Sequence, residues 1–162
     1  MSTLYVDSIQ PKTTGGNVTI TNQANAGKLL QVVQVIGTTS QSTTSTSYVN
    51  YSYANASITP SSTNSKILVQ MECGINSFDA GDNASTSVKI YKDGSPLSNE
   101  KTVRTYVNGG TGVLSRGSAA INYLDSPSTT SSITYQLYFK RDQGSYDNAI
   151  QNASITLMEI GG

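Results

Sequence analysis

The sequence predicts an all-β protein of the sandwich or barrel type, and three observations support this prediction. Residues that favour strands, such as Thr, Tyr, Val and Ile, are frequent, whereas the helix formers Ala, Leu, Glu and Lys are scarce. Several segments alternate apolar and polar residues with the period of two that half-buried strands show. Clusters of Gly, Asn, Asp, Ser and Pro separate these segments at the spacing expected of short strands.

The composition also indicates a chain that folds. Hydrophobic residues make up only 36%, but charged residues make up 12% and the formal net charge is zero. Disordered chains combine low hydrophobicity with high net charge, and that combination is absent here. A length of 162 residues suffices for one domain and a short arm. We therefore expect an N-terminal arm at residues 1–27 and a β-sandwich domain at residues 28–162.

The expected arm contains two short β-prone pieces, at residues 4–9 and 17–21. An isolated two-stranded hairpin is only marginally stable in water, so these pieces should not fold alone. We expect them to become ordered by packing against another copy of the chain or against another protein.

The first strand of the domain is expected in LLQVVQVIG, a segment that is apolar on both sides. In its alternation Leu30 and Val32 share one face, while Leu29, Val33 and Val35 share the other. Such a strand needs cover on both faces, from a second sheet and from something else.

The stretch TTSQSTT, residues 38–44, admits three interpretations: a flexible linker, a stalk for sugars, or a strand. Thr favours strands and its hydroxyl can pair across them, and a stalk would carry Pro, whereas only Gln41 interrupts this run. We therefore predict an edge strand or hairpin. After it the alternation resumes, with Val49, Tyr51 and Tyr53 on one side.

Three further segments alternate clearly, and about eight strands are expected after residue 28. Their inward-facing residues are Ile67, Val69, Met71, Cys73 and Ile75 in the first, Val88 and Ile90 in the second, and Ile133, Tyr135, Leu137 and Phe139 in the third. An Asp-Gly pair at residues 93–94 predicts a tight hairpin turn after the second segment.

Most catalytic arrangements are excluded because the chain has no histidine. Neither a Ser-His-Asp triad, nor a Cys-His pair, nor the usual zinc sites can form without it. Paired carboxylates stay formally open, since Glu72 and Glu159 are strand residues that could meet across a sheet. The single cysteine, Cys73, lies in an apolar strand, which favours a packing thiol over a reactive one. We expect a protein that is not an enzyme and has no cofactor.

Other ligand classes are also disfavoured. Asp79, Asp82 and Asn83 offer oxygen ligands for calcium, but they lack the spacing of an EF-hand loop, so a plain turn is expected. A neutral chain without a Lys/Arg cluster argues against nucleic-acid binding. No segment approaches about eighteen consecutive apolar residues and the N-terminus has no signal-peptide pattern, so we expect no membrane insertion and synthesis in a cytoplasm.

Tyrosine dominates the aromatic residues, with ten Tyr against two Phe and no Trp. A tyrosine combines a broad apolar face with a hydroxyl, which suits subunit interfaces and the recognition of sugars or proteins. The candidates outside the clearest core pattern are Tyr51, Tyr53, Tyr106, Tyr138 and Tyr146. The alternative for each of them is a ring half-buried on a sheet.

Several segments together resemble the β-sandwich domain found in virion proteins of tailed bacteriophages, especially marine and cyanobacterial ones. They are GKLLQVVQV with the Thr/Ser run and SYVNYS, then ITPSSTNSKILVQ, INYLDSPSTTSSITYQLYFK and the terminal NASITLMEIGG. The segment STLYVDSIQPKTTGGNVTI resembles the short attachment arm that precedes such domains. The resemblance implies a jelly-roll-like antiparallel β-sandwich with a short N-terminal β arm, and it implies a homotrimer.

The resemblance suggests two functions for a non-enzymatic virion structural protein. The first is a trimeric tail-fibre or receptor-binding knob that the N-terminal arm anchors, and the second is a capsid decoration protein that clamps the head shell. The expected partners are further copies of the chain, other virion proteins of the tail or capsid, and a glycan or protein of the host surface. The expected location is the virion, after synthesis in the host bacterial cytoplasm.

Residues can be assigned to each role as hypotheses. The proposed trimer interface comprises Leu29, Val33, Val35, Ile155, Leu157 and Ile160. The proposed virion-anchoring residues are Leu4, Val6, Ile9, Val18 and Ile20. The proposed receptor-contact residues, in loops at the far end of the sandwich, are Asp79, Asp82, Asn83, Asn108, Tyr146 and Asp147.

Overall fold

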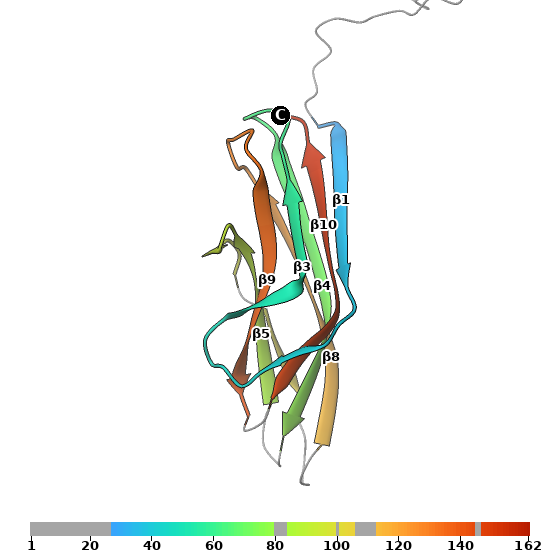
Figure 1. Cartoon of the computed structure of the whole chain (residues 1–162), viewed down its shortest axis with the longest axis vertical. Helices are drawn as coiled ribbons and strands as arrows, with labels where there is room; N and C mark the ends of the chain where they lie inside the picture. Colours follow the sequence, from blue (N-terminus) through green and yellow to red (C-terminus); the bar gives the residue numbers. More distant parts are fainter. Residues whose placement is uncertain (1–26, 80–83, 100, 106–112, 145–146) are drawn as a thin grey trace, which may run out of the picture.

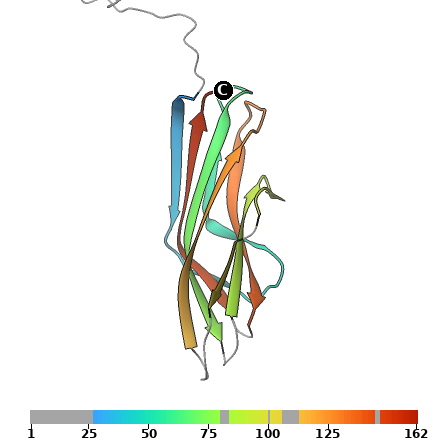
Figure 2. The ribbon, with the colours of Figure 1, turned by 180° about the vertical axis from the view of Figure 1, so that it is seen from behind.

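A computed structural model describes residues 27–79, 84–99, 101–105, 113–144 and 147–162. Within these ranges the chain forms ten strands and no helix (Figures 1 and 2). The all-β prediction is therefore confirmed. Apart from Gly27, the expected arm at residues 1–27 lies outside the described residues.

The strands form two antiparallel sheets. Sheet A has the order β1 (Leu29–Gly37), β10 (Asn148–Ile160), β4 (Lys66–Asp79) and β8 (Val113–Asp125), and β2 (Gln41–Thr43) also pairs with β10. Sheet B has the order β3 (Val49–Ile58), β9 (Ile133–Gln143) and β5 (Ala84–Lys92), and both β6 (Ser95–Pro96) and β7 (Lys101–Thr105) pair with β5.

The connections between these strands are those of a jelly roll. β1 and β2 pair with opposite ends of β10, and β6 and β7 pair with opposite ends of β5, so each sheet has four strand positions in the described chain. From β3 to β10 the chain passes back and forth between the sheets, apart from the short steps within sheet B from β5 to β7. Eight positions in two facing sheets with this order give the jelly-roll topology. The predicted fold class is confirmed.

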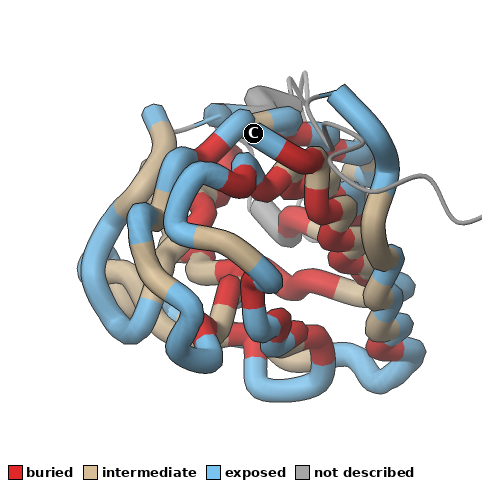
Figure 3. The backbone as a smooth tube through the Cα atoms, turned by 90° about the horizontal axis from the view of Figure 1, so that it is seen from above, coloured by how far each residue is buried: buried red, intermediate tan, exposed pale blue. Residues whose placement is uncertain are grey.

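The core lies between the two sheets, where the alternation predicted it (Figure 3). Every predicted inward residue of β4, β5 and β9 is buried, with 5% exposure or less. The fully buried Tyr135, Leu137 and Phe139 of β9 belong to the same core cluster as Ile67, Val69 and Ile75 of β4. Cys73 is part of this core, and burial raises the pKa of its thiol to about 12. The expected packing thiol is confirmed.

Strand β3 departs from the prediction because it contains a bulge. Its pairing with β9 is interrupted between Asn50 and Asn55. Four residues of β3 lie between these positions, whereas only Leu137 lies between their partners on β9. The three extra residues shift the alternation, so Tyr51 is fully buried whereas Tyr53 is 46% exposed. The prediction that Tyr53 shares a face with Tyr51 was wrong. Gly37 lies against this bulge, where a Cβ would come within 2.5 Å of the Tyr53 carbonyl oxygen.

Strand β1 also contains an irregularity, next to Leu30. Leu29 pairs with Ile160 and Gln31 with Glu159, so Leu30 is an extra residue in the ladder. Beyond it Val33 and Val35 face inward and pack against the core. The residues that face outward beyond it are Val32 and Ile36, so the sequence-based assignment interchanged the two faces of this strand after Leu30. Leu29, before the irregularity, is exposed as assigned.

The Ser/Thr run forms the predicted edge of a sheet, although only Gln41–Thr43 is strand. The amide of Gln41 bonds the backbone of β3 at the bulge, donating to the Asn50 carbonyl (2.7 Å) and accepting from the Ser52 N–H (3.1 Å). The Tyr51 hydroxyl donates to the carbonyls of Gly37 and Thr39, 3.2 and 2.5 Å away. The run therefore closes one side of the sandwich between sheets A and B.

The predicted Asp-Gly turn joins β5 to β6. Asp93 and Gly94 have φ angles of 48° and 78°. Positive φ at both central positions is the signature of a type I′ hairpin turn. The prediction is confirmed.

Asp125, at the end of β8, links the two sheets. Its Oδ2 atom accepts a hydrogen bond from the Tyr135 hydroxyl of β9 (2.7 Å) and pairs with the Lys92 Nζ of β5 (2.9 Å). Its Oδ1 atom accepts from the Ser126 N–H, as expected of an Asp beside a turn. Burial and the neighbouring carboxylate raise the pKa of Tyr135, so its hydroxyl keeps the proton that it donates.

Candidate interaction surface

The outer face of sheet A carries apolar side chains at the C-terminal end of β10. Figure 1 marks the C-terminus at this end of the sandwich. One row across all four strands consists of Val32, Met158, Leu68 and Leu124, and the next row begins with Leu29 and Ile160. We call these six residues the apolar band. Leu29, Val32 and Leu124 are 58%, 53% and 50% exposed, and the other three are half-buried. Large apolar side chains in adjacent rows on a surface are typical of an interaction site.

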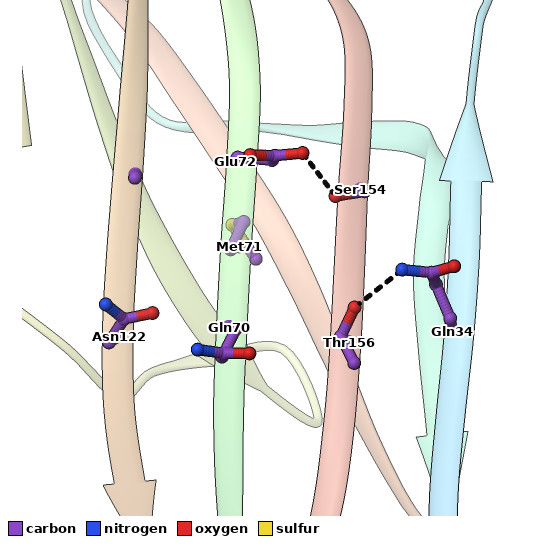
Figure 4. Close-up of a pocket in the computed structure, with 8 residues that line it drawn as sticks. Gln34, Gln70, Met71, Glu72, Asn122, Ser154 and Thr156 are labelled. Atoms are coloured by element: carbon purple, nitrogen blue, oxygen red, sulfur yellow. Dashed lines mark hydrogen bonds between the residues drawn. The ribbon is translucent and has the colours of Figure 1, made fainter.

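Next to the apolar band the same face becomes polar, and Figure 4 shows the polar side chains. A row of amides and hydroxyls comprises Gln34, Thr156, Gln70 and Asn122. Gln34 Nε2 donates to Thr156 Oγ1 at 2.9 Å, and in the next row Ser154 Oγ donates to Glu72 at 3.3 Å. These residues border a shallow depression of about 230 Å³. Its polar groups can exchange hydrogen bonds with a partner, but Glu72 is its only ionisable side chain.

Glu72 and Glu159 lie on opposite faces of sheet A. Glu72 is exposed on the outer face, whereas Glu159 lies on the inner face and is fully buried. The possibility that they meet across the sheet was therefore wrong. A paired-carboxylate site of these two residues is excluded by the register of β4 and β10.

The Glu159 carboxylate accepts hydrogen bonds from two neighbouring segments at the end of the sandwich that carries the apolar band. Its Oε1 atom accepts from the Ser61 N–H (2.7 Å) and hydroxyl (2.6 Å), and its Oε2 atom accepts from Gln31 Nε2 (2.5 Å). Burial alone would raise the pKa of Glu159, but these hydrogen bonds favour the charged form and the pKa is lowered to about 2. β1, β10 and the loop after β3 are thereby tied together.

The predicted trimer-interface residues divide into two groups. Leu29 and Ile160 belong to the apolar band, whereas Val33 and Val35 pack on the core and Ile155 and Leu157 are fully buried in it. The assignment of these last four residues to an outer face was wrong, because β1 and β10 turn those side chains toward sheet B. The outward residues that replace them, Val32, Leu68, Leu124 and Met158, were missed. The sequence feature that could have identified them is an apolar residue on the side of a strand that is otherwise polar.

The other assigned residues are described only in part. Leu4, Val6, Ile9, Val18 and Ile20, the anchoring residues, lie outside the described residues, as do Asp82, Asn83, Asn108 and Tyr146 and the side chain of Asp79. Asp147 is exposed beside the start of β10, with Ser42 Oγ 3.4 Å from its carboxylate. This position is at the end of the sandwich away from the C-terminus, where the receptor-contact loops were expected. The receptor contact itself stays a prediction.

Tyrosines were predicted as recognition residues, and Tyr138 lies on the outer face of sheet B. It is half-buried and stacks on Tyr91. Tyr106 and Tyr146 lie outside the described residues.

The described residues contain no group of three or more His, Cys, Asp or Glu side chains that could hold a metal ion. In the same part of the chain, no helix is long and apolar enough to cross a membrane.

Comparisons with known proteins do not assign a family. No protein-family model matches the chain, and no curated protein matches it. Similar solved structures come from infectious bursal disease virus. The Gt strain structure has a TM-score of 0.48 at 14% identity, over 98% of this chain and 38% of that chain. The T13 viral particle gives 0.47 at 15% identity, over 82% and 31% of the two chains.

This chain therefore spans about a third of the length of those viral chains. At these TM-scores and identities the similarity indicates neither a family nor a function.

Proposed function

We propose that this protein is a non-enzymatic structural component of a virus particle whose jelly roll self-associates through the apolar band. In its finer form the proposal is a homotrimeric knob of a tailed bacteriophage, of the tail-fibre or receptor-binding type, anchored by residues 1–27. The observation that carries the proposal is the exposure of the apolar band on one face of sheet A.

A further copy of the same chain is the occupant that best fits the apolar band. Burying apolar side chains is favourable in water, and soluble monomers rarely leave several of them in adjacent rows uncovered. The chain has a formal net charge of zero, so copies can approach without overall repulsion. The polar row with Gln34 and Asn122 borders the band on the same face and can supply hydrogen bonds around an apolar centre, as interfaces require.

The position of the chain ends supports a knob that is held at one end. Gly27 N–H donates to the Gly161 carbonyl at 2.7 Å, and Gly161 N–H donates to the Lys28 carbonyl at 2.8 Å. Gly27 therefore lies at the end of the sandwich that carries the apolar band, where β10 ends (Figure 1), whereas Asp147 precedes the start of β10 at the other end. An attachment arm at that end would leave the opposite loops accessible to a receptor.

The chemistry of the chain supports a structural role rather than catalysis. The sequence has no histidine, and the depression on sheet A brings together amides and hydroxyls around one exposed carboxylate. Since a jelly roll alone implies no function, the virion assignment relies on the sequence resemblance together with the apolar band.

The location and copy number of the protein on the particle test the proposal. Cryo-electron microscopy of particles that contain the protein, with its copy number from quantitative mass spectrometry, should find a few trimers at the tail. Copies spread over the capsid lattice would replace the knob by a decoration protein. Absence from purified particles would contradict a virion role altogether.

A further inference from the structure

The outer face of sheet B carries a cluster of tyrosines and lysines that no part of the proposed assembly uses. Tyr91 and Tyr138 stack with ring centroids 3.8 Å apart and planes inclined by 16°. Tyr48 lies beside them, with its centroid 6.0 Å from that of Tyr91. The Nζ atoms of Lys89 and Lys140 lie 5.2 and 5.1 Å from the Tyr48 centroid. We call these five residues the tyrosine–lysine patch.

The neighbouring positions add amides to this patch. Asn50, Tyr138 and Lys89 form one row across β3, β9 and β5, and Asn55, Gln136 and Tyr91 form the next. Asn50 and Asn55 bond each other through their side chains at 3.2 and 3.3 Å, which fixes them on the surface. This surface of sheet B therefore presents phenol, ammonium and amide groups in adjacent rows.

Three polar groups of the patch make neither a hydrogen bond nor an ion pair with the described residues. The hydroxyls of Tyr91 and Tyr138 make no hydrogen bond there, and Lys89 makes no ion pair. All three side chains are half-buried rather than covered, so a ligand can reach them. Lys140, by contrast, pairs with Asp142 at 3.5 Å and so contributes a partly neutralised charge.

The arrangement of the rings favours hydrogen bonding over base stacking. Tyr91 and Tyr138 each turn one face to the other, and ammonium groups lie over the Tyr48 ring. Nucleic-acid binding would need open ring faces and a broad basic surface, and the chain is neutral overall. Hydroxyls, amides and a cation at short range instead match a sugar that carries a negative charge.

We propose that the tyrosine–lysine patch binds an acidic sugar, with Lys89 pairing with its carboxylate or phosphate and the Tyr91 and Tyr138 hydroxyls bonding its hydroxyl groups. The site is independent of the apolar band, which lies on the other sheet. Three hydrogen-bonding side chains bind one small ligand only weakly, so a dissociation constant of about 1 mM is expected for a monosaccharide. Several copies in one assembly would strengthen the binding of a polymer through multivalency.

The test is a titration of the full ¹⁵N-labelled chain followed by amide chemical shifts. The probes are glucuronic acid, glucose 6-phosphate, inorganic phosphate and neutral glucose. We expect shifts clustered around Lys89, Tyr91 and Tyr138 with the two acidic sugars, and weaker ones with glucose or with phosphate alone. The two acidic sugars distinguish a carboxylate from a phosphate ligand.

Two variants and a matched control locate the binding. Lys89→Gln removes the charge and should weaken binding at least about tenfold. Tyr138→Phe keeps the ring stack and removes one hydroxyl, so binding should weaken by a smaller factor. Lys66→Gln changes an exposed lysine on the opposite sheet and should leave binding unchanged.

The proposal is overturned by any of three results. They are equal shifts with glucose and glucuronic acid, no shift at the patch with either acidic sugar, and tighter binding of a single-stranded oligonucleotide at the same residues. None of these results bears on self-association through sheet A, so the two proposals fail separately.

Discussion

The outer faces of the two sheets cover the same core from opposite sides but carry different chemistry. On sheet A the apolar band leaves Val32 and Leu124 half or more exposed. On sheet B the corresponding surface carries the tyrosine–lysine patch, in which rings pack on rings and lysines lie over them. Covering the first surface with another protein is favourable, because it removes apolar side chains from water. The second surface is stable in water and offers hydrogen-bonding groups to a ligand. We therefore propose assembly through sheet A and recognition through sheet B.

The largest expected effect distinguishes the two faces of β1. Val33→Asp places a carboxylate against the core, so the free energy of unfolding should fall by about 4 kcal/mol or more. Val32→Asp changes a side chain that is 53% exposed and should leave the monomer folded. Urea unfolding followed by circular dichroism measures both variants. Equal losses would contradict the placement of Val32 outside and Val33 inside.

The next prediction compares two aspartates: Asp125, which links the two sheets, and Asp142, which pairs with Lys140 on sheet B. Asp125→Ala leaves the fully buried Tyr135 hydroxyl without its acceptor and Lys92 without its partner, so we expect a loss of about 3 kcal/mol. Asp142→Ala removes a partner of Lys140 on sheet B and the acceptor of the buried Ser85 hydroxyl, and it should cost about 1 to 2 kcal/mol. Thermal and urea unfolding of the two variants should rank them in this order, and the reverse order would refute the role of Asp125.

The Glu159 carboxylate should make the end of sheet A sensitive to acid. Its folded pKa of about 2 lies below the ordinary value of 4.5, so its stabilising contribution is complete above pH 4.5 and is lost as the pH falls toward 2. This loss should approach about 3 kcal/mol.

The Glu159→Gln variant isolates this contribution, because an amide does not titrate in this range. The difference in unfolding free energy between the two proteins should shrink steadily below pH 4.5. A constant difference from neutral pH down to about pH 2.5 would show that Glu159 is not held in its charged form.

The smallest effect compares two glutamines. Gln41→Ala removes the hydrogen bonds to the β3 backbone at Asn50 and Ser52, and we expect a loss of about 1 to 2 kcal/mol. Gln34→Ala removes one exposed hydrogen bond on the outer face of sheet A and should change stability by less than about 0.5 kcal/mol. Chemical denaturation of both variants checks this, and equal effects would mean that Gln41 does not close the sandwich.

The sequence predicted the all-β class and the inner faces of β4, β5 and β9, because the regular alternation of each strand puts most of its apolar residues on one side. It could not orient β1, since that strand is apolar on both sides and the extra residue Leu30 shifts its phase. The bulge in β3 was equally hidden, because the stretch containing Tyr51 and Tyr53 reads as a plain alternation. Irregular pairing depends on the partner strand, which local pattern does not reveal.

The candidate surface was predicted in part. Leu29 and Ile160 were identified, but Leu68 and Leu124 were not, because their common surface arises only from the order β10, β4, β8. The burial of Glu159 could have been predicted from the sequence, because Glu159 shares the alternation of Ile155 and Leu157 and therefore lies on the same, inner face of β10. A charged residue in an inward phase indicates a buried hydrogen-bonded group. The tyrosine–lysine patch joins strands distant in the sequence and could not be found from spacing.

The central claim is that copies of the chain associate through the apolar band, and the solution mass of the full chain tests it most directly. Light scattering coupled to size-exclusion chromatography should give three times the 17.1 kDa of one chain. The double variant Val32→Asp with Leu124→Asp should give 17.1 kDa, while Tyr53→Asp, an exposed residue of sheet B, should remain trimeric. A wild-type monomer at high concentration, or a double variant that still trimerises, would contradict the account.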